Sequence, residues 1–232
     1  MNKSFRRYLS VFIRGWIGSV LIALLIATAF RSAIADWYVV PTGSMIPTIV
    51  EGDRIFANKI AYDLKVPYTT LRIASWDDPN RGDIVVFNSP ADGKRLVKRI
   101  VGIPGDIIAM RNNRLSINGE VLRYDFIDIE SLEPSPSSSD TKQEIYIEDL
   151  TGHKHKTMVM PYQPSIRSFE PVIVPDGHYF MMGDNRDNSA DSRYFGFIDR
   201  KEILGQATAI LISLDLQHYY RPRWLRFFTK LQ

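Results

Sequence analysis

The longest apolar run of the chain lies near its N-terminus, between Arg14 and Arg31, and contains no charged residue. It is slightly shorter than the roughly 20 residues that a membrane-spanning helix needs. Because long cationic side chains can reach the interface from inside a helix, a span over 15–35 is reasonable. Trp16 and Trp37 lie near the two expected interfaces, where aromatic residues are common. The pattern predicts one transmembrane helix, since no second long apolar run follows.

The same segment also has the form of a cleavable signal peptide. A basic stretch, 1–14, and an apolar core precede an Ala-Ile-Ala sequence that ends at Ala35, directly before Asp36. If the segment is retained, the basic stretch predicts a cytoplasmic N-terminus and an extracytoplasmic remainder. The apolar pattern alone leaves both interpretations open.

After this segment the pattern changes to short β-branched runs. They occupy 83–87, 96–101, 107–110, 171–174, 178–182 and 203–212. Gly-Asp, Pro-Gly or Asn-Gly turn signals bound most of them. Regularly spaced short strands favour an all-β sandwich or barrel, so the remainder of the chain is predicted to be mainly β.

Composition limits the function classes. The formal net charge of +3 is too small to indicate a nucleic-acid partner. Basic residues at both ends of the chain could contact anionic lipid headgroups. The chain has no cysteine, which excludes disulfides and a thiol nucleophile.

Ser44 is the first candidate for chemistry. It lies in Pro-Thr-Gly-Ser-Met-Ile-Pro-Thr, 41–48, shortly after the apolar segment. A serine hydroxyl is a weak nucleophile unless a neighbouring group takes its proton. None of the four histidines lies in a run typical of a catalytic base, so a lysine is the expected base. The best candidate is Lys98, within 95–106.

A strand over this segment would place Lys98 on one face with Leu96 and Ile100. Apolar neighbours would bury the amine, and burial lowers the pKa of a lysine because it disfavours the ammonium form. Arg99 fits the same alternation, because its own neighbours on the opposite face are also apolar. The strand pattern therefore does not choose between the two residues.

A third polar segment, 183–193, reads Gly-Asp-Asn-Arg-Asp-Asn-Ser-Ala-Asp-Ser-Arg. Its acidic start suggests a calcium loop, but that template needs glycine at position six and glutamate at position twelve. Counted from Asp184, those positions hold Ser189 and Phe195. We expect no metal here and no cofactor.

Together the segments 41–48, 95–106 and 183–193 resemble the motifs of bacterial signal peptidase I, in the same order and spacing. This family comprises membrane-bound serine/lysine endopeptidases that remove signal peptides from exported preproteins. The resemblance runs from about 30 to about 215, and the Ser-Ala-Asp-Ser-Arg sequence is most similar to Gram-negative members. Because the family acts at a membrane face, the resemblance favours a retained anchor over a cleaved signal peptide.

The resemblance implies roles for the first two motifs. Ser44 would be the nucleophile, and Lys98 rather than Arg99 would be the general base. The backbone N–H of Ser44 and the hydroxyl of Thr42 would stabilise the oxyanion. Many relatives have serine at the position of Thr42, but threonine keeps the donor.

The third motif would support this pair. By its match to the family, Ser189 hydrogen-bonds the Lys98 amine and orients it. Asp191 and Arg193 correspond to a structural ion pair, with Asp184 and Arg186 in support.

The family cleaves after Ala-x-Ala, where small side chains enter shallow apolar pockets. Four residues close in sequence to the motifs are predicted to line these pockets: Met45, Ile46, Ile84 and Val86.

The implied fold is a signal-peptidase-like antiparallel β-sheet catalytic core with an inserted smaller β subdomain, preceded by one transmembrane helix. The core would comprise 36–117 and 176–215, and the insertion 118–175, with a flexible Ser/Pro loop at 131–140. Within the basic aromatic tail, 216–232, the segment 224–231 is expected to form a short packing or interfacial helix. Many Gram-negative relatives have two spans, whereas this pattern predicts one.

The resemblance implies exported preproteins as substrates, with membrane lipids and the secretion translocon as further partners. It places the protein in the bacterial inner membrane, with its catalytic part on the periplasmic side. Two alternatives stay open: a peptidase with a narrow substrate in conjugation or pilin processing, and a non-catalytic binding domain associated with export. The autoproteolytic repressors use similar chemistry, but a DNA-binding helix-turn-helix would stand where this chain has its apolar segment.

Overall fold

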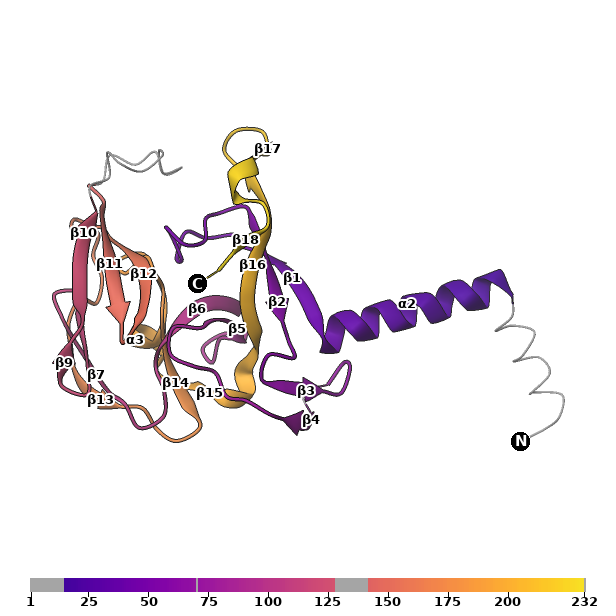
Figure 1. The fold of residues 1–232 in the computed structure, drawn as a ribbon, viewed down its shortest axis with the longest axis horizontal. Helices are drawn as coiled ribbons and strands as arrows, with labels where there is room; N and C mark the ends of the chain where they lie inside the picture. Colours follow the sequence, from indigo (N-terminus) through magenta and orange to yellow (C-terminus); the bar gives the residue numbers. More distant parts are fainter. Residues whose placement is uncertain (1–14, 70, 128–141, 232) are drawn as a thin grey trace.

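The computed structural model describes residues 15–69, 71–127 and 142–231. The basic stretch 1–14 and the loop at 131–140 lie outside these described residues. The described chain consists of antiparallel sheets and one long N-terminal helix that extends away from them (Figure 1). The prediction of a mainly β protein preceded by one apolar helix is confirmed.

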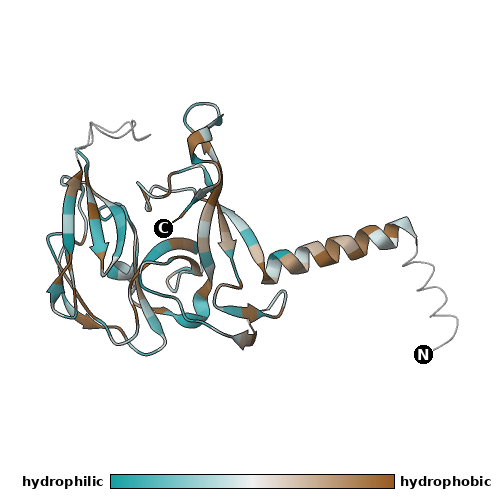
Figure 2. Ribbon diagram, in the orientation of Figure 1, coloured by the Kyte–Doolittle hydropathy of each residue, from teal (hydrophilic) through white to brown (hydrophobic). Residues whose placement is uncertain are grey.

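The helix α2 spans Trp16–Ala33 and is apolar over most of its length (Figure 2). Only Gly18 and Ala33 are buried among its residues. Within the described residues it is the one helix long and apolar enough to cross a membrane. Its exposed leucine, isoleucine and valine side chains suit a lipid environment better than a protein core.

The main sheet combines strands from both ends of the sequence. In sheet order they are β1 (Ala35–Val39), β2 (Asp53–Asn58), β16 (Ile203–Asp215), β5 (Ile84–Asn88), β6 (Arg95–Gly102), β14 (His178–Met182) and β15 (Ile198–Asp199). Neighbouring strands are antiparallel throughout. Two short strands, β17 (Arg221–Pro222) and β18 (Thr229–Lys230), also pair with β16.

Three smaller sheets accompany the main one. One contains β13 (Phe169–Ile173), β7 (Ile107–Arg111), β8 (Arg114–Ile117) and β9 (Glu120–Val121). A second contains β10 (Arg123–Ile127), β11 (Glu144–Leu150) and β12 (His153–Val159), and a third is the hairpin β3 (Asp63–Lys65) and β4 (Arg72–Ser75). The first of these sheets pairs strands from before and after residue 118, and the boundaries at 118 and 175 stay predictions.

Apolar side chains cover both faces of the central strand β5. Ile84 and Val86 pack into one hydrophobic cluster, and Val85 and Phe87 pack into another on the opposite face. The neighbouring strand β6 is paired with β5 in register, with Lys98 opposite Val85. The Lys98 side chain, in the middle of β6, is therefore buried in the interior of the protein.

The C-terminal tail differs from the expected helix. It forms a three-residue 3₁₀ turn, η3 (Trp224–Arg226), between β17 and β18. Arg226 pairs with the buried Asp53 at 2.6 Å, and Arg223 donates to the carbonyl oxygen of Glu51 at 2.9 Å. These contacts and the pairing with β16 hold the tail extended along the sheet, where a continuous helix could not make them. Two further single-turn helices are α3 (Ser192–Phe195) and η2 (Arg200–Glu202).

Candidate active site

Ser44 lies in a tight turn between β1 and β2. The Ile46 N–H donates to the Gly43 carbonyl at 3.2 Å, and the Ile49 N–H donates to the Met45 carbonyl at 2.9 Å. Met45 and Ile49 are buried and anchor the turn in the core. A Cβ atom on Gly43 would lie 2.8 Å from Cδ1 of Ile46, so a larger residue there would require the end of the Ile46 side chain to shift. This packing holds Ser44 half-buried beside the main sheet.

Lys98 reaches Ser44 from the middle of β6. Its Nζ lies 2.6 Å from the Ser44 Oγ and 3.1 Å from the carbonyl oxygen of Val97. The residue is 2% exposed. Burial lowers the pKa of Lys98 to about 8, although the carboxylates of Asp191 and Asp184 act in the opposite direction. A large fraction of these amines is therefore neutral at mildly alkaline pH.

Arg99, the alternative that the strand pattern left open, points to a different partner. Its Nε and Nη2 atoms bind the two carboxylate oxygens of Asp184 at 2.9 and 2.8 Å, and Nη1 donates to the Gly82 carbonyl at 2.8 Å. Burial raises the pKa of the Asp184 carboxyl, but the Arg99 guanidinium outweighs this effect and keeps it below its ordinary value. Asp184 also accepts a hydrogen bond from the Thr48 hydroxyl at 2.5 Å. Arg99 thus ties the third motif to β6.

The third motif, 183–193, is also hydrogen-bonded to the turn around Ser44. The Asn185 backbone N–H donates to the Ser44 carbonyl at 3.2 Å, and its side-chain amide donates to the Gly43 carbonyl at 3.1 Å. Asp191 and Arg193 form a fully buried ion pair at 2.8 Å. Asp191 also accepts from the Gly183 N–H at 3.0 Å. Asn185 therefore joins the loop to the turn, and the buried ion pair stabilises the loop itself. The sequence indicated no role for Asn185.

Ser189 lies close to the turn, but its contacts differ from those expected. A Cβ atom on Gly183 would lie 2.3 Å from the Ser189 Oγ and 2.4 Å from the Ser44 carbonyl oxygen, so both atoms pack against that glycine. The buried Ser189 Oγ has no hydrogen-bond partner within the described residues. The hydrogen bond to Lys98 that the resemblance implied is absent, because the amine is directed to Ser44 and Val97 instead.

The two expected oxyanion donors lie in the same turn. Thr42 is exposed, two residues before Ser44. Within the described part of the chain, neither the Thr42 hydroxyl nor the Ser44 backbone N–H donates to another group. Both donors are therefore free to bind an oxyanion.

The four residues predicted to line substrate pockets divide between two clusters. Met45, Ile84 and Val86 belong to one hydrophobic cluster, whereas Ile46 belongs to another that includes Met158. Ile84 also borders a cavity of about 400 Å³ near the end of the chain. The other lining residues of this cavity include Arg99, Gln206, Ala207 and Leu231.

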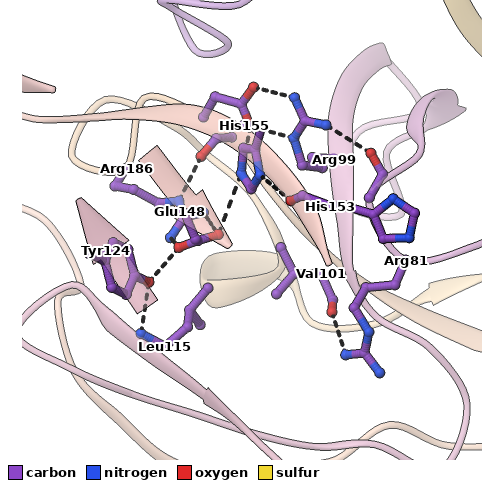
Figure 3. Close-up of polar contacts among 12 residues, drawn as sticks. Arg81, Arg99, Val101, Leu115, Tyr124, Glu148, His153, His155 and Arg186 are labelled. Carbon is purple, nitrogen blue, oxygen red and sulfur yellow. Dashed lines mark hydrogen bonds and ion pairs between the residues drawn. The ribbon is translucent and has the colours of Figure 1, made fainter. Parts of the chain in front are cut away.

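A buried charged network links Arg186 and His155 with Glu148 of the small β10–β11–β12 sheet (Figure 3). Arg186 binds both carboxylate oxygens of Glu148 at 2.7 Å, and Tyr124 donates to the same carboxylate. His155 Nε2 lies 3.4 Å from Glu148 and 3.8 Å from Asp184. Burial lowers the pKa of His155 to about 4, which keeps it neutral near pH 7.

The sequence did not reveal Glu148 and His155 as part of this arrangement. Both lie in the divergent stretch 118–175, and only tertiary folding brings their strands against the third motif. Within the described residues, no group of three or more His, Cys, Asp or Glu residues is suited to hold a metal ion.

Comparisons of the sequence with known proteins identify the family of the chain. The family described as "Signal peptidase, peptidase S26" matches residues 13–212. The Signal peptidase I of Pseudomonas aeruginosa is 35% identical over 202 residues, which cover 82% of this chain and 69% of that protein. The Signal peptidase I P of Bacillus subtilis subsp. natto is 34% identical over 203 residues, which cover 86% of this chain and 89% of that protein. A crystal structure of a signal peptidase I from Enterococcus faecalis V583 is 33% identical, covers 58% of this chain and 100% of that chain, and has a TM-score of 0.36.

Proposed function

The chain belongs to the signal peptidase family, peptidase S26, and we propose that it is a membrane-anchored serine endopeptidase that removes N-terminal signal peptides from exported preproteins. The observation that carries this proposal is the 2.6 Å contact between the buried Lys98 amine and the Ser44 hydroxyl. An amine held in that position can take the serine proton only when it is neutral, and burial favours the neutral form.

In the proposed mechanism, Lys98 accepts the Ser44 proton while Oγ attacks the carbonyl carbon of the scissile peptide bond. The oxyanion that forms receives hydrogen bonds from the Ser44 N–H and the Thr42 hydroxyl. The Lys98 ammonium then gives its proton to the leaving amine, and the signal peptide stays attached to Ser44 as an ester. A water molecule, deprotonated by Lys98, hydrolyses the ester and restores the free serine.

Asp191, Arg193 and Asn185 act as positioning residues in this proposal. Asn185 supports this role through its two hydrogen bonds to the Ser44 turn, and the buried Asp191–Arg193 pair supports it by stabilising the third motif itself. Ser189 would act by packing beside Gly183, and its unpartnered hydroxyl is available to bind the amine or substrate during turnover.

Cleavage should require a small residue immediately before the cut. Met45, Ile84 and Val86 are proposed to border the pocket that receives it, and their dense packing leaves little room for a large side chain. We expect a preprotein with phenylalanine at that position to be cleaved at least about 100-fold more slowly than one with alanine. Measured kcat/KM values for the two substrates test this expectation, with a phenylalanine two positions before the cut as the matched control. Equal rates for the phenylalanine and alanine substrates would contradict the proposed pocket.

We propose a cytoplasmic N-terminus and an extracytoplasmic Ser44, with α2 as a single-pass anchor in the bacterial inner membrane. Asp36, the first residue after the possible cleavage site, pairs with Arg31 at 2.6 Å and with Lys59 at 3.4 Å. Lys59 also donates to the carbonyl oxygens of Arg31 and Ser32. These contacts join the end of α2 to the catalytic sheet, which supports a retained anchor.

Protease protection in right-side-out and inverted vesicles tests this topology. The part of the chain after α2 should be digested in right-side-out vesicles and protected in inverted ones. Mass spectrometry of the purified protein should find the segment before Asp36 still attached. A mature chain that begins at Asp36 would show that the segment is a signal peptide.

The alternatives to this proposal are a narrow-substrate peptidase and a non-catalytic binding domain. Cleavage of one general model preprotein by the full chain in lipid vesicles, with Ser44→Ala as control, separates the three. Cleavage that depends on Ser44 supports the proposed function. Cleavage of pilin-type or conjugation substrates alone would favour the first alternative, and binding without cleavage would favour the second.

A further inference from the structure

A patch of exposed apolar side chains lies on the β3–β4 hairpin. Tyr68, Leu71, Ile73 and Trp76 are 61%, 67%, 61% and 54% exposed. All residues of β4 are exposed, whereas most residues of β5 and β6 in the main sheet are buried. Large apolar side chains gathered on a two-stranded ribbon indicate an interaction surface, because exposing them to water is unfavourable and contact with an apolar partner removes that cost.

Hydrogen bonds fix the hairpin against α2. The Tyr68 hydroxyl lies 2.5 Å from the Thr28 Oγ1 and 3.4 Å from the carbonyl oxygen of Leu25. The Tyr68 backbone N–H donates to the Ser32 hydroxyl at 2.7 Å. The hairpin therefore lies beside the end of α2 that joins the main sheet (Figure 1).

The contacts with α2 set the depth of the hairpin in a membrane. The 18 residues of α2 extend about 27 Å at about 1.5 Å per residue, close to the roughly 30 Å of a hydrocarbon layer. Thr28 and Leu25 lie about 8 and 12 Å before the last residue of the helix, Ala33, on the same scale. If α2 spans the layer, the Tyr68 hydroxyl lies inside it, on the side of the catalytic sheet.

The charged side chains of the hairpin point away from the expected hydrocarbon layer. The stretch 66–71 between the strands contains no charged residue. Lys65 donates to the carbonyl oxygen of Ile203 at 2.8 Å, and Arg72 pairs with Asp63 at 2.9 Å. Both cations thus point back to the protein body, as a hairpin in contact with hydrocarbon requires.

The backbone around the tip also satisfies several of its own polar groups. The Val66 N–H donates to the Leu71 carbonyl at 2.8 Å, and the Thr69 N–H donates to the Val66 carbonyl at 3.1 Å. In hydrocarbon no water can serve as a partner, so internal hydrogen bonds are needed. The tip is therefore suited to contact acyl chains.

We propose that the β3–β4 hairpin inserts Tyr68, Leu71 and Ile73 into the acyl chains of the leaflet on the catalytic side, as a second membrane contact beside α2. The proposal concerns lipid binding and goes beyond peptide cleavage, but it rests on α2 spanning the membrane. Two attachment points would restrict rocking of the catalytic sheet about the single helix. Ser44 would then be held at a fixed height above the membrane.

The absence of cysteine allows a direct test, because a single introduced cysteine can be labelled selectively. Leu71→Cys and Ile73→Cys are labelled with the fluorophore NBD in the full chain, reconstituted in phosphatidylethanolamine/phosphatidylglycerol vesicles. The matched control is Val121→Cys, which is 70% exposed on β9, far from α2 (Figure 1). Leu24→Cys, in the middle of α2, reports the span itself.

We expect blue-shifted emission at positions 71 and 73 and at least about twofold quenching by lipids that carry a nitroxide on the acyl chain. Position 24 should behave likewise, whereas position 121 should be quenched by aqueous iodide and not by the nitroxide lipids. Iodide quenching at 71 and 73 without nitroxide quenching would overturn the proposal. Blue-shifted emission without nitroxide quenching would overturn it too, since it indicates a protein partner or a second copy.

Loss of nitroxide quenching at position 24 would overturn the proposal as well, because α2 would then not span the membrane. Preprotein cleavage is measured in the same vesicles as a separate readout, which tests the peptidase function without using the fluorescent labels. A chain that cleaves its substrate but keeps positions 71 and 73 in water would refute the hairpin insertion and leave the proposed peptidase function intact.

Discussion

Replacing Lys98 with arginine is expected to reduce kcat by at least about 1,000-fold, as fully as Ser44→Ala does. A guanidinium keeps its proton at any usable pH, so it cannot accept the Ser44 proton even if it occupies the same place. Lys98→Ala should cause a similar loss, and the double variant with Ser44→Ala should be no worse than either single one, because the two residues act as a unit. Single-turnover cleavage of a model preprotein in vesicles measures these losses.

The pH dependence of the same reaction provides a second readout. Burial lowers the pKa of Lys98 to about 8, so the amine is charged and inactive below that pH and neutral above it. We expect kcat to rise with pH, by about tenfold per unit well below pH 8, and to level off above it. Near-normal turnover in Lys98→Arg would show that another residue is the base, as would a rate that is constant from pH 6 to pH 9.

Replacing Arg99 with methionine should give the largest loss of stability. The substitution leaves the carboxylate of Asp184 buried without its bidentate partner, beside the neutral His155. Removing one member of a buried ion pair typically costs about 3–5 kcal/mol. Denaturant unfolding of the detergent-solubilised protein, followed by tryptophan fluorescence, should show a loss of that size.

Arg95→Met is the matched control, because it lies on the same strand but is exposed. Its guanidinium stacks on the Tyr38 ring at 4.8 Å, so the expected loss is about 1 kcal/mol or less. The pH dependence of stability has a definite sign. The pKa of Asp184 is lowered in the folded state, so its stabilising contribution is present at neutral pH and lost as pH falls through that lowered pKa. Equal stability of the Arg99→Met and Arg95→Met proteins would refute this account.

Local sequence determined much of this protein. The uncharged run after Arg14 was sufficient to predict the apolar helix, which the structure places at Trp16–Ala33. β-branched runs bounded by turn signals indicated β5, β6 and β14, because strand formation there follows from nearest neighbours. The resemblance to signal peptidase I is also confirmed, since short motifs carry that signal.

The short range of sequence patterns also explains the incorrect expectation for the tail. A mixture of aromatic and cationic residues over 224–231 suggested a helix, but the segment forms a 3₁₀ turn and a short strand. Its conformation is decided by Asp53 and by β16, which lie far away in the sequence. Local propensity is a weak preference that such tertiary contacts override.

Sequence alone determined which residue types were available for the chemistry: a serine with glycine before it, no histidine nearby, and adjacent Lys98 and Arg99. Only the tertiary structure decided how they are used. Pairing of β5 with β6 and docking of the third motif direct Lys98 to Ser44 and Arg99 to Asp184. The same folding buries Glu148, His155 and Arg186 behind them. Strand alternation specifies a face but not its partner, and pKa values and ion pairs depend on the distances and burial that the fold creates.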